Sequence, residues 1–305
     1  MPIHQSSKRG EISCDKKDVV LLNRKERSAK VPGVLGARLC SGTGKSPFLM
    51  GVGDCILLDF SKWFFAVGDS PEWNTSSSRV FMIKFDRMLA DCLDNSSDCV
   101  YSQQEWADLK DVIVQHTHML LESILFEVNC TFTGILIANT DLGREGIVFH
   151  TGDSLLYQCN NKTGKSSLVT QSNFWMIGKT KQLYQVDTMV IEESTRLLIA
   201  TDGLSDIDVT DGVDRNEFIG NLFQENAVEN IPCVLLDRGR LKQGYVDDVG
   251  IITINPNELY SDDKIVVIGG TTSNVEQMFQ ERVANEYYQD NYISLKNESG
   301  LIIVI

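Results

Sequence analysis

The sequence lacks the features that mark a structural zinc site, a secreted protein or a membrane protein. Its eight cysteines contain no Cys-x-x-Cys pair, so the ligand spacing of a zinc site is missing. The first residues, MPIHQSSKRGEISCDKKD, contain no apolar signal core, and no hydrophobic run reaches the length of a membrane span. We therefore expect a cytoplasmic protein with reduced thiols.

Positively charged residues are also in the minority. The chain has 28 Lys and Arg against 42 Asp and Glu, which gives a formal net charge of −14. Such a chain repels nucleic-acid backbones and anionic membranes, so we expect neither as a partner. Hydrophobic residues make up 42% of the 305 residues, which is enough for a sizeable core and excludes a disordered protein.

A phosphate-binding loop of the nucleotide-binding type is missing as well. The segment SGTGKS at residues 41–46 ends in the required Gly-Lys-Ser, but the first glycine of that motif should stand where this chain has Leu39. We therefore expect residues 41–46 to form an ordinary loop.

What the sequence does have is three acidic turns beside apolar segments. They are WFFAVGDS (63–70), RLLIATDG (196–203) and GYVDDVGIITI (244–254). Carboxylates are costly beside buried strands unless positive charge holds them there. Asp69 and Asp202 end apolar strands whereas Asp247 and Asp248 begin one, so they can meet at one edge of an antiparallel sheet. Asp and Gly are common in any turn, but three such turns together favour a site for hard divalent cations.

The first acidic turn belongs to a predicted β-hairpin. The apolar segments CILLDF (55–60) and WFFAV (63–67) are separated by Ser61 and Lys62. Pairing residues symmetrically about this turn places Asp54 opposite Asp69. Two facing carboxylates repel each other unless a cation lies between them.

The remaining pattern favours an α+β fold with antiparallel sheets. Helical periodicity covers residues 78–95 and 102–128, and the second helix opens with the capping box Ser-Gln-Gln-Glu. Strands follow, and the turn at Gly152-Asp153 has the chemistry of a hairpin. A further helix is expected over residues 215–228. The predicted elements follow one another as strands, then helices, then many strands. This order is typical of α+β proteins.

The chain divides into three expected parts. Residues 1–30 are polar and basic and are expected to form a tail. Residues 31–257 form the main domain. Residues 258–305 form an accessory βαβ-like element, in which a strand, a helix and a last apolar strand follow each other.

Four motifs in order resemble the metal-dependent protein phosphatases, the PPM or protein phosphatase 2C superfamily. They are FFAVGDS, HTGDSLLYQ, LLIATDGLSD and DDVGIITI. The last two are most similar to the bacterial sporulation-type (SpoIIE-like) branch. The resemblance implies a four-layer αββα sandwich of two antiparallel sheets flanked by helices. It also implies two Mn²⁺ or Mg²⁺ ions and hydrolysis of phosphoserine or phosphothreonine in proteins.

The resemblance also implies roles for individual residues. Asp69 matches the carboxylate that bridges the two ions, and Ser70 stands where the family supplies a backbone carbonyl. Asp202 and Asp247 match ligands of one ion, so Asp69, Asp202 and Asp247 would act in catalysis through the metals and a bound water. No covalent nucleophile is needed for this chemistry.

Three further carboxylates match outer positions of the family's site. Asp54 matches an acid that acts through coordinated water, and Asp153 and Asp206 match positions that can hold a third ion. The chain also departs from the family. Gly53 replaces the first of two usual acids, and Ser70-Pro71 replaces a glycine and its small neighbours.

Two groups of the eukaryotic members are missing. Leu49 stands where a phosphate-binding arginine is usual, and Pro71 stands at the position of a histidine thought to act as general acid. The sporulation-type branch lacks both groups too. Relatives of that branch act on small regulatory proteins, so the resemblance implies such a substrate.

Two other functions are weighed against the phosphatase. A pseudophosphatase would keep the fold but signal through protein contacts, and the departures at Gly53 and Ser70 favour it. Retention of Asp69, Asp202 and Asp247 favours the enzyme, because a scaffold needs none of these costly carboxylates. A two-metal nucleotide cyclase would need a base-recognition feature, which we do not find. Metal identity and formation of a homo-oligomer stay open.

Overall fold

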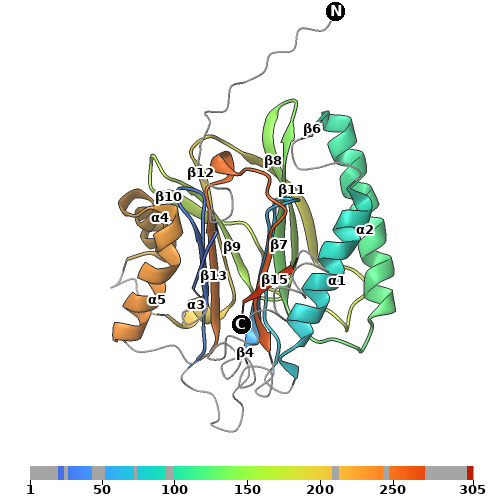
Figure 1. The fold of residues 1–305 in the computed structure, drawn as a ribbon, viewed down its shortest axis with the longest axis horizontal. Helices are drawn as coiled ribbons and strands as arrows, with labels where there is room; N and C mark the ends of the chain where they lie inside the picture. Colours follow the sequence, from blue (N-terminus) through green and yellow to red (C-terminus); the bar gives the residue numbers. More distant parts are fainter. Residues whose placement is uncertain are drawn as a thin grey trace, which may run out of the picture.

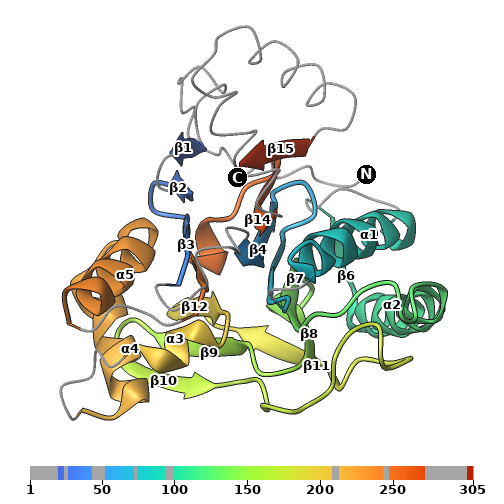
Figure 2. The ribbon, with the colours of Figure 1, turned by 90° about the horizontal axis from the view of Figure 1, so that it is seen from below.

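The computed structural model shows two facing β-sheets with helices on both outer faces (Figures 1 and 2). The structure describes residues 20–23, 27–42, 52–71, 74–93, 99–207, 213–242, 247–271 and 301–304. The expected four-layer α+β sandwich is therefore confirmed.

The first sheet has the strand order β1-β2-β3-β13-β12-β9-β10, and all its neighbours are antiparallel. Its strands are β1 (Leu21–Asn23), β2 (Ser28–Val31), β3 (Leu35–Cys40), β13 (Val249–Ile254), β12 (Thr195–Ala200), β9 (Leu155–Asn160) and β10 (Lys165–Leu168). Helices α4 (Arg215–Glu225) and α5 (Ile231–Lys242) pack on its outer face together with the short α3 (Gly203–Asp206) (Figure 1).

The second sheet has the order β11-β8-β7-β5-β4-β14-β15, and β6 (Val100–Tyr101) pairs with β7. Its strands are β11 (Gln185–Ile191), β8 (Gly143–Thr151), β7 (Phe132–Thr140), β5 (Phe64–Gly68), β4 (Val52–Asp59), β14 (Ile265–Thr271) and β15 (Leu301–Val304). Helices α1 (Ser77–Cys92) and α2 (Gln103–Ser123) cover its outer face (Figure 2). Two 3₁₀ turns, η2 (Val228–Asn230) and η3 (Pro256–Glu258), complete the described elements.

Strand β4 shows why both faces of the second sheet are apolar. Ile56 and Leu58 belong to the core between the sheets, whereas Cys55 and Leu57 belong to the core beneath α1 and α2. Side chains alternate between the two faces of a strand. Asp54, two residues before Ile56, therefore lies on the inner face, at the end of the interface between the sheets.

Local predictions hold for the hairpin and for the start of α2. The hairpin pairs Cys55 with Gly68 and Ile56 with Val67, so continuing this register by one residue places Asp54 opposite Asp69, as expected. The Ser102 hydroxyl accepts the backbone N–H of Glu105, and the Glu105 side chain accepts that of Ser102, which confirms the capping box. Both helices end earlier than predicted, at residues 92 and 123.

The expected hairpin at Gly152-Asp153 is wrong. Strand β8 belongs to the second sheet and β9 to the first, so this turn carries the chain from one sheet to the other. Turn residues specify a reversal of direction, but they do not decide whether the flanking strands pair. That choice depends on the neighbours that each strand finds in the sandwich. Helix α5 was not expected from the sequence.

The ends of the chain contribute to both sheets. Residues of the expected tail form β1 and most of β2, which pairs with β3. In the expected accessory element, β14 pairs directly with β4, and β15 lies parallel to β14. The helix expected between these two strands lies outside the described residues.

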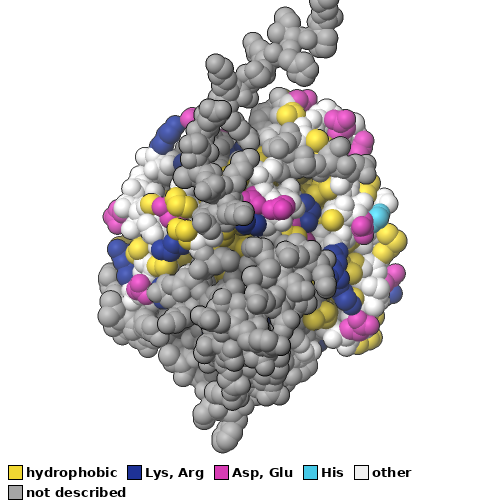
Figure 3. Space-filling model, viewed as in Figure 1, with side chains coloured by type: hydrophobic (Ala, Val, Ile, Leu, Met, Phe, Trp, Pro, Cys, Tyr) yellow, Lys and Arg dark blue, Asp and Glu magenta, His cyan; other side chains and the backbone are white. Residues whose placement is uncertain are grey.

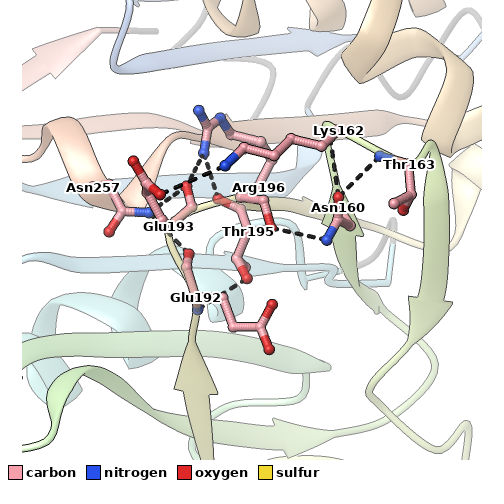
Figure 4. Close-up of polar contacts among 9 residues, drawn as sticks. Asn160, Lys162, Thr163, Glu192, Glu193, Thr195, Arg196 and Asn257 are labelled. Carbon is pink, nitrogen blue, oxygen red and sulfur yellow. Dashed lines mark hydrogen bonds and ion pairs between the residues drawn. The ribbon is translucent and has the colours of Figure 1, made fainter.

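A network of hydrogen bonds, together with an exposed ion pair between Lys162 and Glu193, fastens one end of the sandwich (Figure 4). The Asn257 amide donates to the carbonyls of Glu192 and Glu193, each at 3.0 Å. The Arg196 guanidinium donates to the carbonyls of Glu193 and Thr195. Because β12 begins at Thr195, this network lies at the opposite end of β12 from the acidic turn.

Charges are mixed on the described surface. On the face shown in Figure 3, the described Lys and Arg side chains lie interspersed with Asp and Glu and form no continuous basic area. Within the described residues, no helix is both long enough and apolar enough to cross a membrane.

A buried ion cluster supports the β4–β5 turn. Lys62 pairs with Asp59 and lies 3.3 Å from Asp86 on α1, and both carboxylates are almost fully buried. Burial, together with the charge of Asp59, raises the pKa of Asp86 to about 8. Lys62 is therefore the cation that makes two buried carboxylates tolerable at the contact between hairpin and helix.

We predict that Lys62→Met lowers the free energy of unfolding by about 3–5 kcal/mol, because it removes the cation from a buried ion pair with Asp59. Chemical denaturation at neutral pH measures the effect. The matched control is Lys84→Met, which removes an exposed ion pair with Glu127 and should cost less than about 1 kcal/mol. Equal losses in the two variants would contradict the prediction.

Candidate functional site

The three acidic turns lie at the same end of the sandwich. Strand β12 ends two residues before Asp202 and β13 begins two residues after Asp247, and the adjoining residues Thr201 and Gly250 are hydrogen bonded. Asp69 follows β5 in the other sheet. The turns therefore meet across two facing sheets, and not along the edge of a single sheet as the sequence suggested.

Asp54 and Asp69 are two acids that act on each other where the sheets meet. The Thr201 hydroxyl donates to Oδ2 of Asp54 at 2.6 Å, and Asp54 is only 1% exposed. Burial raises the pKa of Asp54 well above its usual range, and the charges of Asp69 and Asp248 raise it further. The surroundings of Asp54 therefore oppose its ionisation.

Other carboxylates act on the same pair. Burial raises the pKa of Asp69 to about 6. A hydrogen-bond contribution from Asp54 lowers this pKa, whereas the charges of Asp247, Asp153 and Asp248 raise it further. Burial also raises the pKa of Asp153, with a further contribution from Asp247. The structure thus brings five carboxylates within electrostatic reach of one another.

The Asp69 turn is fixed to the turn at Asp153. Thr131 accepts the N–H of Asp69 through its hydroxyl at 3.1 Å and donates its own N–H to the Asp69 carbonyl at 2.8 Å. The same hydroxyl is 3.0 Å from that of Ser154. Gly152 has φ +108°, and a side chain there would meet Thr131 at 2.6 Å. This packing explains the glycine of the Thr-Gly-Asp-Ser motif.

Ser70 has a structural role beside the acidic turn. Its hydroxyl accepts the N–H of Ser78 at 2.6 Å, which satisfies a free donor in the first turn of α1. The Ser78 hydroxyl in turn donates to the carbonyl of Gly53 at 2.8 Å. A side chain at Gly53 would collide with the Ser70 carbonyl oxygen. Gly53 thus lets the Asp69-Ser70 turn pack directly on β4.

The sequence reasoning missed two residues. Thr201 donates to Asp54, and Asp248 is 1% exposed and binds two backbone N–H groups, one after β3 and one in β4. The signal for Asp248 was present in the paired acids of the third turn, but only Asp247 was assigned a role. Asp202 is partly exposed at the start of α3, and Asp206 ends that helix.

The donor set fits a hard divalent cation. All candidate donors are oxygens, the carboxylates raise one another's pKa values, and Oδ1 of Asp153 is buried with no hydrogen-bond donor among the described residues. In the described part of the chain, however, no group of three or more His, Cys, Asp or Glu side chains is arranged to hold a metal ion.

Solved structures resemble this fold over most of its length. The serine/threonine phosphatase PstP/Ppp of Mycobacterium tuberculosis matches with a TM-score of 0.52 at 17% identity, over 72% of this chain and 96% of that chain. The S. agalactiae serine/threonine phosphatase matches with a TM-score of 0.53 at 14% identity, over 75% and 100%. This chain has the fold of the PPM-type serine/threonine phosphatases.

One PPM-fold structure holds metal. The catalytic domain of PstP in complex with two manganese ions matches with a TM-score of 0.51 at 17% identity, over 72% of this chain and 97% of that chain. No protein-family model matches the sequence, and no curated protein matches it significantly. The expected PPM resemblance is thus confirmed through its fold.

We predict that Gly53→Ala destabilises the protein by about 1–3 kcal/mol, because the new methyl group collides with the rigid backbone of Ser70. Urea denaturation measures the change. Gly250→Ala is the control, since its methyl group would lie 3.4 Å from the nearest atom, an ordinary contact. If Gly53→Ala were as stable as the wild type, the Asp69-Ser70 turn would not be held against β4.

We also predict a pH dependence of the metal-free protein. The pKa of Asp69 is raised in the folded state, so this residue stabilises the fold at low pH and the stabilisation is lost as pH rises through about 6. The loss is on the order of 2 kcal/mol. As the pH rises from about 4 to 7, the stability of Asp69→Asn should fall less than that of the wild type. Thermal melts with chelator present measure the difference.

The exposed Asp111 on α2 supplies the control for this experiment, because Asp111→Asn should leave the pH profile unchanged. A wild-type profile that stays flat over this range would argue against the buried acid pair.

Proposed function

We propose that this protein is a metal-dependent phosphatase that hydrolyses phosphoserine or phosphothreonine in proteins. The observation that carries the proposal is the cluster of mutually repelling carboxylates from both sheets, at one end of a PPM fold. A protein keeps such charges together at a cost to its stability. That cost is understandable if a cation occupies the cluster.

The inner ligands are Asp69, Asp202 and Asp247, with the carbonyl of Ser70 as a further oxygen donor. Two Mn²⁺ or Mg²⁺ ions would fit these oxygens, and the manganese complex of PstP supports this number. Asp54 supports Asp69 from the opposite strand, and Asp153 and Asp206 are available for a third ion.

Bound cations would lower the pKa of a shared water and neutralise the charge on the phosphoryl oxygens. The chain's own residues prepare the site for this chemistry. Thr201 orients the carboxyl group of Asp54 between the sheets. A bound cation would favour the ionised form of Asp54, because opposite charge stabilises a carboxylate.

The substrate is proposed to be a phosphorylated protein. A small regulatory protein is the finer proposal, since the last two motifs resemble the sporulation-type branch. We expect neither nucleic acid nor membrane as a partner, in keeping with the net charge of −14. A cytoplasmic location is proposed from the reduced-thiol composition, and the described cysteines are free of disulfide bonds.

A pseudophosphatase is the second candidate. It is favoured by the lack of a ready three-ligand metal group among the described residues. It is also favoured by the packing of the Ser70 carbonyl against Gly53, because a carbonyl engaged in this contact must turn to reach an ion. Such a protein would keep the fold and signal through protein contacts.

We predict Mn²⁺-dependent hydrolysis of p-nitrophenyl phosphate and of a phosphoserine peptide, abolished by EDTA. Asp202→Ala should lower kcat/KM by at least about 100-fold, because it removes a ligand of the ion that activates water. The control is Asp111→Ala on the exposed face of α2, which should leave turnover unchanged.

The two hypotheses give different outcomes. A folded wild-type protein without metal-dependent turnover would exclude the phosphatase and leave the pseudophosphatase. Full turnover in Asp202→Ala would instead show that the ligand assignment is wrong, while the activity itself stands.

A further inference from the structure

Asp248 is a buried carboxylate that joins the two sheets at their acidic end. Its Oδ1 accepts the backbone N–H of Gly42 and its Oδ2 that of Gly53, each at 2.9 Å. Gly42 follows β3 in the first sheet, whereas Gly53 lies in β4 of the second sheet. Asp248 itself precedes β13. One side chain thus ties three chain segments together.

A cation supports this carboxylate. Burial lowers the pKa of Arg27, and the nearby charge of Asp248 opposes that shift. The Arg27 guanidinium donates to the hydroxyl of Ser41 at 2.6 Å, one residue before Gly42. Opposite charge and two backbone donors together explain why a carboxylate that is 1% exposed is tolerated here.

The expected metal ligands lie next to the groups that Asp248 holds. Asp247 directly precedes Asp248, and Asp54 directly follows Gly53. The Asp202-Gly203 turn also packs on the same residue, because a side chain at position 203 would collide with the Asp248 carbonyl oxygen. A displacement of Asp248 would therefore move ligands from both sheets relative to one another.

We propose that Asp248 is a positioning residue that sets the spacing between the metal ligands of the two sheets. This inference rests on the proposed function. Each of its oxygens already accepts a backbone N–H, which distinguishes it from Asp247. Asparagine cannot replace it, because the amide nitrogen would present hydrogens to an N–H donor and leave either Gly42 or Gly53 without an acceptor.

The test is Mn²⁺ binding to the full chain, measured by isothermal titration calorimetry on wild type and Asp248→Asn. We expect the apparent Kd for Mn²⁺ to rise about 10- to 100-fold in the variant, the range found when groups that orient metal ligands are removed. If Asp248→Asn does not fold, Asp248→Glu carries the same expectation, since it keeps the charge but shifts both oxygens by one methylene.

A matched control separates positioning from stability. Thr253 lies near the far end of β13, the strand that follows Asp248, is fully buried, and donates to the carbonyl of Val228 at 2.6 Å. Thr253→Val removes this buried hydroxyl, which also lies 3.4 Å from the Gly36 carbonyl oxygen, and should lower the thermal midpoint. We expect its Mn²⁺ affinity to stay within twofold of the wild type, roughly the limit of the measurement.

Three results would overturn the inference. The first is wild-type Mn²⁺ affinity in Asp248→Asn. The second is an equal loss of affinity in Thr253→Val, which would reduce Asp248 to a contributor to general stability. The third is a wild type that neither binds Mn²⁺ nor shows turnover. That result would reject the proposed function as well and is therefore distinguishable from the first two.

Discussion

Repulsion between buried carboxylates at the meeting point of two sheets is the constraint on which the rest of this structure depends. Burial raises the pKa of Asp54 well above its usual range, and the charges of Asp69 and Asp248 further oppose its ionisation. The surrounding residues respond to this constraint. Thr201 donates to Asp54, and Thr131 holds the backbone of Asp69.

Glycines at this end of the molecule serve the same purpose. Gly53, Gly152 and Gly203 each lie where a side chain would collide with a neighbouring turn. Close backbone approach within each sheet leaves room for the acidic turns to meet without long side chains between them. The opposite end of β12 is fastened by hydrogen bonds around Asn257 and by the Lys162–Glu193 ion pair. The acidic turns are thus gathered at one end of the sandwich.

Much of the fold could be predicted because its signals are local. Symmetry about Ser61 and Lys62 placed Asp54 opposite Asp69, since a short hairpin leaves little freedom in its register. The capping box at Ser102 was recognisable because its partners lie three residues apart. The prediction of a hairpin at Gly152 was wrong, because the same turn residues suit both a hairpin and a connection between two sheets. Only the neighbours of β8 and β9 distinguish the two.

The candidate site was predictable in its chemistry but not in its construction. The sequence by itself determined that acidic turns at strand ends would gather, because strand alternation and antiparallel order leave few other places for Asp69, Asp202 and Asp247. Only the tertiary structure decided that two sheets share the site, and that adjacent acids take different roles. Asp248 binds the N–H groups of Gly42 and Gly53 through its two carboxylate oxygens, whereas Asp247 accepts the N–H of Asp248. Asp247 and Asp248 are chemically identical neighbours in the chain, and their roles differ because Asp248 contacts residues about 200 positions away.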